Sequence, residues 1–61
     1  MLSTSIAKAI NNQIGDEFNA AYLYLSMSAY CESIGFQGVA KWLRKQSAEE
    51  VEHAMKLIGY M

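Results

Sequence analysis

Apolar side chains recur along the first half of the chain at the spacing of one wide helical stripe. Two neighbouring rows follow the i, i+3/i+4, i+7 rule of an amphipathic helix; they are Ile6, Ile10, Gln13, Glu17, Tyr24 and Cys31, and Ile14, Phe18, Ala21, Leu25 and Ala29. The polar row on the outside is Lys8, Asn12, Gly15, Asn19, Tyr22 and Ser26. Ser3 precedes the stripe and has the hydroxyl of an N-cap. These rows predict one long helix that starts near Ser3 and packs on two sides.

The helical pattern is interrupted at residues 33–38, where Gly35 suits the left-handed residue that closes a helix. A second pattern runs from about Gly38 to Tyr60. Its inner row is Val39, Leu43, Gln46, Glu50, His53 and Leu57, and its outer row is Lys41, Lys45, Glu52 and Lys56. A break this short joins antiparallel neighbours. We therefore predict that residues 1–61 form a single all-α unit, an antiparallel helical hairpin.

Candidate chemistry lies on the inner row of the second helix. Glu50 and His53 are three residues apart, so they share one face of a helix. Burying a carboxylate and an imidazole within an apolar row costs free energy unless a hydrogen-bond partner or a bound ion compensates for the lost water. A transition metal with oxygen and nitrogen ligands would do so. The spacing therefore makes Glu50 and His53 candidate metal ligands.

Folding the chain about Gly35 brings Glu17 of the first helix to the level of Glu50 and His53 in the second. Glu17 precedes Gly35 by nearly the same length of chain as separates Gly35 from Glu50. At ~1.5 Å of rise per residue, the two carboxylates differ in height by about 4.5 Å, which is less than one helical turn. One hairpin thus offers two carboxylates and one imidazole at nearly one level.

The chain is short and rich in apolar residues, which predicts self-association. It has 61 residues, of which 52% are hydrophobic, and a domain of this size buries too little surface to be more than marginally stable. Two copies related by a two-fold axis would supply four helices, two Glu17 carboxylates and two Glu50-x-x-His53 pairs. That set matches the ligands of the di-iron carboxylate bundles. We expect a homodimer or higher homo-oligomer that forms a four-helix bundle through the apolar helix faces.

Charge and composition exclude several other classes of function. The net charge of -1 offers no basic surface for nucleic acid. No apolar run approaches the ~20 residues of a membrane span, and the mixed charges of the helices disfavour a hairpin that lies on a membrane surface. The first five residues lack the basic and apolar regions of a signal peptide. A lone cysteine, Cys31, forms no internal disulfide and suits a reducing compartment, so we expect a cytoplasmic protein.

A set of segments, in this order and spacing, closely resembles the N-terminal part of bacterial non-haem ferritins. The resemblance covers all 61 residues. The segments are Ile10-Asn11-Asn12-Gln13, Asp16-Glu17, Tyr22-Leu23-Tyr24-Leu25-Ser26-Met27-Ser28, Gly35-Phe36, Trp42-Leu43-Arg44-Lys45-Gln46-Ser47 and Glu49-Glu50-x-x-His53-Ala54. In that family the matching positions form a di-iron ferroxidase centre. The family oxidises Fe(II) with O2 or peroxide and stores the ferric product inside a hollow shell.

The resemblance implies a role for each matching residue. Glu17, Glu50 and His53 would bind the first iron, with Glu50 bridging toward the second. Tyr24 would be the tyrosine close to the di-iron centre, and Glu49 would be a ligand of a third, accessory iron. Considered without the resemblance, Glu49 is equally well explained as a partner of Lys45, and Tyr24 as a core aromatic whose hydroxyl needs a partner.

The chain also departs from that family, whose subunits continue through further helices that carry the remaining ligands. Either the chain is a fragment, or a second copy supplies the missing half. The leading hypothesis is an iron-binding, ferritin-like protein that oxidises Fe(II) and contributes to iron storage. The alternative is a self-associating helical module without turnover, in which Glu17, Glu50 and His53 no longer act on iron.

Overall fold

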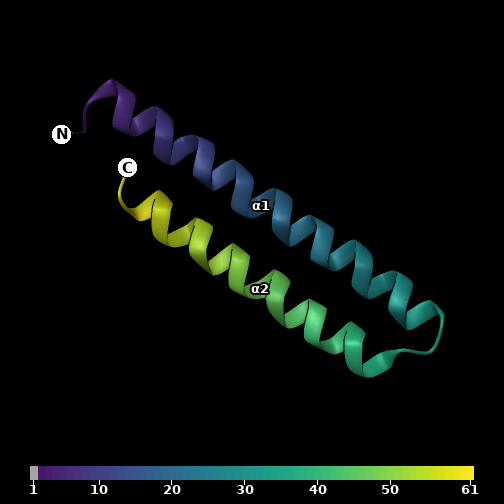
Figure 1. Cartoon of the computed structure of the whole chain (residues 1–61). Coiled ribbons are helices and arrows are strands. Elements are labelled where there is room, and N and C mark those ends of the chain that lie inside the picture. Colours follow the sequence, from purple (N-terminus) through teal and green to yellow (C-terminus); the bar gives the residue numbers. More distant parts are fainter. Residues whose placement is uncertain (1) are drawn as a thin grey trace.

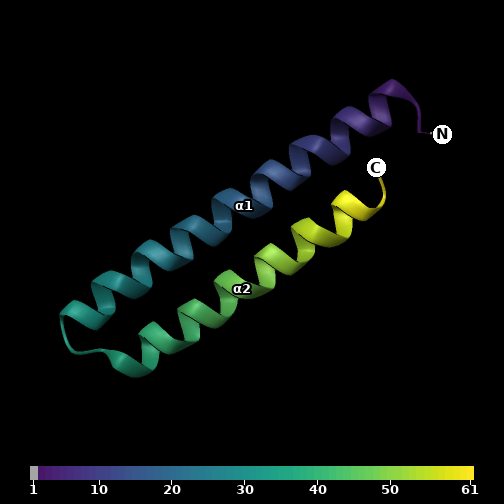
Figure 2. The same cartoon turned by 180° about the vertical axis from the view of Figure 1, so that it is seen from behind.

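Two long helices lie side by side and run in opposite directions in the computed structural model (Figure 1). The structure describes residues 2–61; Met1 lies outside the described residues. Helix α1 spans Thr4–Ser33 and helix α2 spans Gln37–Gly59. Seen from behind, no third element within residues 2–61 covers either face of the pair (Figure 2). The prediction of an all-α helical hairpin is confirmed.

Both ends of α1 are fixed by the residues that the sequence indicates. The Ser3 hydroxyl accepts a hydrogen bond from the Ile6 backbone N–H at 3.2 Å, as an N-cap does. At the other end Gly35 has a φ of 89°, a conformation that side chains disfavour. The Phe36 N–H donates to the Cys31 carbonyl at 2.8 Å and the Gly35 N–H donates to the Glu32 carbonyl at 3.2 Å, which is a Schellman motif. The chain therefore reverses at Gly35, and α2 starts one residue before the predicted Gly38.

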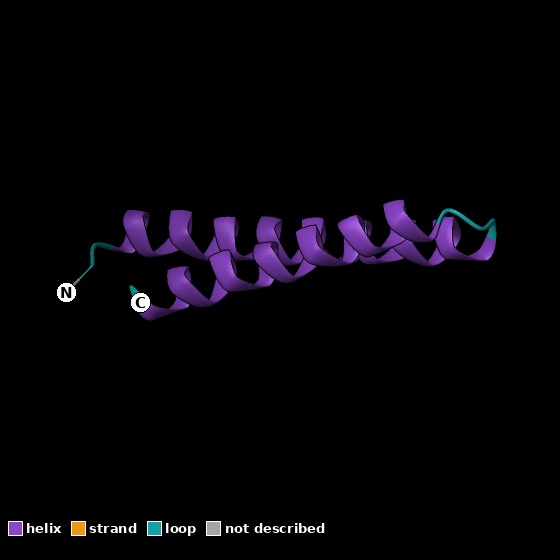
Figure 3. Ribbon diagram, turned by 90° about the horizontal axis from the view of Figure 1, so that it is seen from below, coloured by secondary structure: helices purple, strands orange, loops and turns teal. Residues whose placement is uncertain are grey.

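Small side chains fill the seam between the helices. Ala40 and Ala54 of α2 are 0% exposed, and the other buried residues are Ala21, Ser28, Leu43 and Ser47. Seen from below, the two helices cross at a shallow angle (Figure 3). On α2 the small buried residues recur every seven positions, as in the contact line of two helices that cross in this way. Across the seam, the Ser47 hydroxyl donates to the backbone carbonyl of Ala21 at 2.8 Å. This buried bond joins the two helices directly.

The predicted inner rows were wrong in part. Val39 and His53 were expected to face inward, and both are more than half exposed. Leu43 of the predicted row is buried, as expected. The other buried residues of α2 are Ala40, Ser47 and Ala54, each one position after Val39, Gln46 and His53 of the predicted row. On α1, Ile6 and Gln13 of the predicted inner row are likewise exposed. The physical reason is that two helices meet most closely along their smallest side chains, whereas the prediction followed the larger ones.

Most of the large apolar side chains within residues 2–61 are exposed. The hairpin is a thin slab whose Cα trace measures 49 × 14 × 8 Å, so each helix is covered on one side only. Exposed large apolar residues occur along both helices, among them Phe18, Tyr22, Leu25, Val39, Trp42, Met55 and Tyr60. Neither helix within residues 2–61 is both long enough and apolar enough to cross a membrane.

The close seam predicts that enlarging Ala54 destabilises the hairpin. Ala54→Leu should lower the free energy of unfolding by about 1–3 kcal/mol, because the added side chain forces the helices apart. Ala48→Leu, at an exposed position of the same helix, should change it by less than about 0.5 kcal/mol. Urea unfolding followed by circular dichroism at equal protein concentration measures both. Equal effects of the two substitutions would contradict this description of the seam.

Candidate metal site

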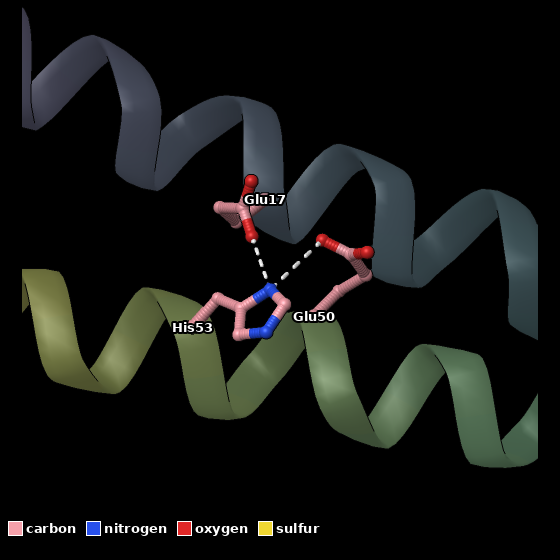
Figure 4. A group of neighbouring side chains, drawn as sticks. All are labelled: Glu17, Glu50 and His53. Atoms are coloured by element: carbon pink, nitrogen blue, oxygen red, sulfur yellow. Dashed lines mark hydrogen bonds and ion pairs between the residues drawn. The ribbon is translucent and has the colours of Figure 1, made fainter.

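Three potential metal ligands from the two helices point toward one another near mid-hairpin (Figure 4). Glu17 extends from α1, and Glu50 and His53 extend from α2. The His53 Nδ1 lies 3.1 Å from Glu17 Oε2 and 3.7 Å from Glu50 Oε2. One ligand atom from each residue can be chosen so that all three lie within 4.8 Å of one another. Such a group is compact enough to hold a single cation.

The register between the helices produces this grouping. Ala21 follows Glu17 by four residues, about one turn, and Ser47 precedes Glu50 by three. The buried hydrogen bond from Ser47 to the Ala21 carbonyl therefore ties the helices together one turn away from the carboxylates. The level at which Glu17 and Glu50 meet follows from this contact and from the bend at Gly35.

The group is open to solvent on one side. The side chains of Glu17 and Glu50 are only 16% and 20% exposed, whereas that of His53 is 55% exposed. The expectation that His53 lies within a buried row is therefore wrong: its imidazole lies at the rim of the seam and reaches back to Glu17. The exposed side leaves room for solvent, a further ligand or a partner chain.

The two carboxylates influence each other's protonation. A hydrogen bond shared with Glu50 is the main cause that lowers the pKa of Glu17, and contacts with His53 and the Gln13 amide lower it further. The same shared bond, together with desolvation and repulsion from Glu17, raises the pKa of Glu50 above its usual value of 4.5. Two like charges are thus held close together, an arrangement that a bound cation would relieve.

Gln13 is a contact of this group that the sequence reasoning did not single out. Its side-chain amide N–H donates to Glu17 Oε1 at 3.0 Å. Gln13 and Glu17 are four residues apart on α1, a spacing at which helical side chains meet. That spacing was the available signal for the contact.

The other two predicted site residues lie outside the group. Tyr24 is half-buried on α1, two turns beyond Glu17 along the helix. Its hydroxyl makes no hydrogen bond to any residue in the described part of the chain. Glu49 is half-buried, and within residues 2–61 it forms no ion pair with Lys45. The roles of Tyr24 and Glu49 at a metal centre stay predictions, as do those of Glu17, Glu50 and His53.

Comparison of the sequence with known proteins identifies its family. The family model for the ferritin-like domain matches residues 7–61, nearly the whole chain. The chain belongs to the ferritin-like domain family. The resemblance to bacterial non-haem ferritins that the sequence motifs indicate is therefore confirmed.

Relatives within the ferritin-like family match along the entire chain. A bacterial non-haem ferritin of Bacteroides fragilis is 48% identical over 61 residues, and one of Campylobacter jejuni is 44% identical over the same length. A probable bacterial non-haem ferritin-like protein of Haemophilus influenzae is 46% identical. The match covers 100% of this chain but only 36–38% of these relatives. No solved structure matches the chain at a significant level.

The raised pKa of Glu50 predicts how stability depends on pH in the absence of metal. The folded chain keeps the Glu50 carboxyl protonated at pH values at which the same carboxyl in the unfolded chain has lost its proton. The free energy of unfolding therefore falls as pH rises from 4.5 through the pKa of folded Glu50. Glu17, with a lowered pKa, contributes stability above 4.5 that is lost as pH falls through its folded pKa.

Glu50→Gln should therefore remove the decline above pH 4.5, whereas Glu52→Gln, at an exposed position of α2, should leave it in place. Urea unfolding of the metal-free protein across this range, at one protein concentration, measures the difference. A decline of the same size in the wild type and in Glu50→Gln would contradict the assigned coupling.

Proposed function

We propose that this chain binds Fe(II) through Glu17, Glu50 and His53 and oxidises it as one half of a di-iron bundle. The observation that carries the proposal is the grouping of these three ligand atoms within 4.8 Å, from two helices, in a member of the ferritin-like family. Two carboxylates and an imidazole suit iron among the transition metals. Iron is here the substrate that enters and leaves the site.

A second copy of the chain would complete the site. One hairpin supplies a Glu from α1 and a Glu-x-x-His pair from α2, and two hairpins supply the full ligand set of a di-iron carboxylate bundle. Exposed large apolar side chains on both helices support this pairing, among them Phe18, Leu25 and Met55. Extensive exposed apolar surface is typical of a surface that a partner covers. The proposed unit is therefore a homodimer with a four-helix core, or a larger assembly of such dimers.

The chain's own residues would bias the reaction toward oxidation. Each Fe(II) gives up one electron; O2 that accepts two electrons and two protons becomes hydrogen peroxide, and peroxide that accepts two more of each becomes water. Anionic oxygen ligands interact more strongly with the ion of higher charge. Glu17 and Glu50 thus favour Fe(III) over Fe(II), and the open side next to His53 gives the oxidant access.

Anaerobic titration tests the binding step. Fe(II) should bind at one ion per chain or more, and Glu50→Ala should weaken binding by more than about tenfold, since loss of a direct ligand exceeds the loss of an outer partner. Glu52→Ala changes a carboxylate that lies on the same helix outside the group, and it should bind as the wild type does. Less than one ion per chain, or unchanged binding in Glu50→Ala, would overturn the proposal.

Oxygen consumption after Fe(II) addition tests turnover. The wild type should consume O2 well above the rate of buffer with iron, and Glu17→Gln should return to that rate. The specific alternative is a self-associating helical module without turnover, which the exposed apolar side chains of both helices would support equally. A protein that associates yet leaves the O2 rate unchanged would establish that alternative.

Sedimentation equilibrium tests the assembly. The solution mass should be at least twice the 6.8 kDa of one chain, because the exposed apolar side chains and the half-set of ligands both call for a partner. Trp42→Glu, which places a charge on the exposed apolar surface, should shift the mass toward one chain. A wild-type monomer at micromolar concentration would exclude a shared site.

A further inference from the structure

We propose that Gln13 is a positioning residue for Glu17: its amide holds one carboxylate oxygen so that the other is presented to the cation. The inference rests on the proposed function, because it concerns the same site. It assigns a role to a residue that is not itself a ligand. The contacts that carry it are the two hydrogen bonds made by the two oxygens of Glu17.

These two bonds separate the oxygens of Glu17 by function. Oε1 accepts from the Gln13 amide at 3.0 Å, and Oε2 lies 3.1 Å from His53 Nδ1. Only Oε2 therefore faces the ligand atoms contributed by α2. A Glu17 that binds a cation in this orientation does so through one oxygen and leaves further coordination positions open.

The orientation needs a partner because the carboxylate does not set it alone. The last torsion of a glutamate side chain is broad, so an isolated carboxylate turns easily about it. Within the described residues, the carboxylate of Glu17 has hydrogen-bond contacts on α1 and on α2, from Gln13 and His53 respectively. Once a cation engages His53 and Glu50, Gln13 is the contact that still fixes the plane of the Glu17 carboxylate.

The pair is more than a stabilising contact on the helix surface. Glutamine pairs at this spacing support isolated helices only weakly, and they do so wherever they occur on a helix. Here the acceptor is the carboxylate of Glu17, which is largely shielded from solvent, and the donor is the exposed amide of Gln13. Outer partners that orient metal ligands change affinity by about 10–100-fold when removed. The proposed role therefore predicts an effect on binding, whereas a purely structural pair predicts an effect on the helix alone.

The test compares Gln13→Met with Asn12→Met in the full chain. Methionine is a strong helix former of similar length, so both variants should keep the helical circular dichroism of the wild type. Asn12 is exposed one residue away and makes no hydrogen bond to Glu17. Co²⁺ serves as the probe, because its visible absorption reports ligand number and geometry while calorimetry gives the Kd.

Gln13→Met should weaken Co²⁺ binding by about tenfold and change the intensity of the cobalt bands, because Glu17 is then free to turn. Asn12→Met should match the wild type in both measurements. The proposal is overturned if Gln13→Met lowers thermal stability but leaves Kd and spectrum unchanged. If the wild type itself binds no Co²⁺ and no Fe(II), the proposed function fails; normal wild-type binding with an unaltered Gln13→Met refutes the positioning role alone.

Discussion

The close contact of α1 and α2 along alanine and serine side chains is the constraint on which the rest of the structure depends. It sets how near the backbones come, and the bond from Ser47 to the Ala21 carbonyl sets how far one helix is shifted along the other. A slip of one residue would turn every side chain of α2 by about 100° around the helix axis. Glu50 and His53 would then leave Glu17, and no second group of ligands within residues 2–61 could replace them.

Much of this arrangement could be predicted from the sequence, because it follows from local signals. Ser3 and Gly35 mark helix ends through properties of single residues, and similar distances from Gly35 place Glu17 and Glu50 at one height. The seam could not be predicted in the same way. Hydrophobic periodicity weights large side chains, whereas helices that approach closely select small ones, and so Ala40 and Ala54 were overlooked in favour of Val39 and His53.

The side-chain geometry of the candidate site was harder still to predict from the sequence, since it depends on contacts across the seam. The spacing of Glu50 and His53 shows that they share a face, but it does not show that His53 is half in solvent and reaches back with Nδ1. The fold holds Glu17 and Glu50 near each other despite their like charge, as the raised pKa of Glu50 records. Repulsion between the two carboxylates opposes folding when both are ionised, and a cation bound between them would relieve it.

The position of the carboxylates along the hairpin has a geometric consequence. Glu17 lies close to the midpoint of α1, so the ligand group is about equally far from the bend and from the open end of the hairpin (Figure 1). A second hairpin could be laid against this face with its bend at the same end or at the opposite end. In either orientation its own carboxylates would arrive at the same level. The placement of the ligand group is therefore compatible with both orientations of a second hairpin, and the exposed apolar side chains along the two helices would decide between them.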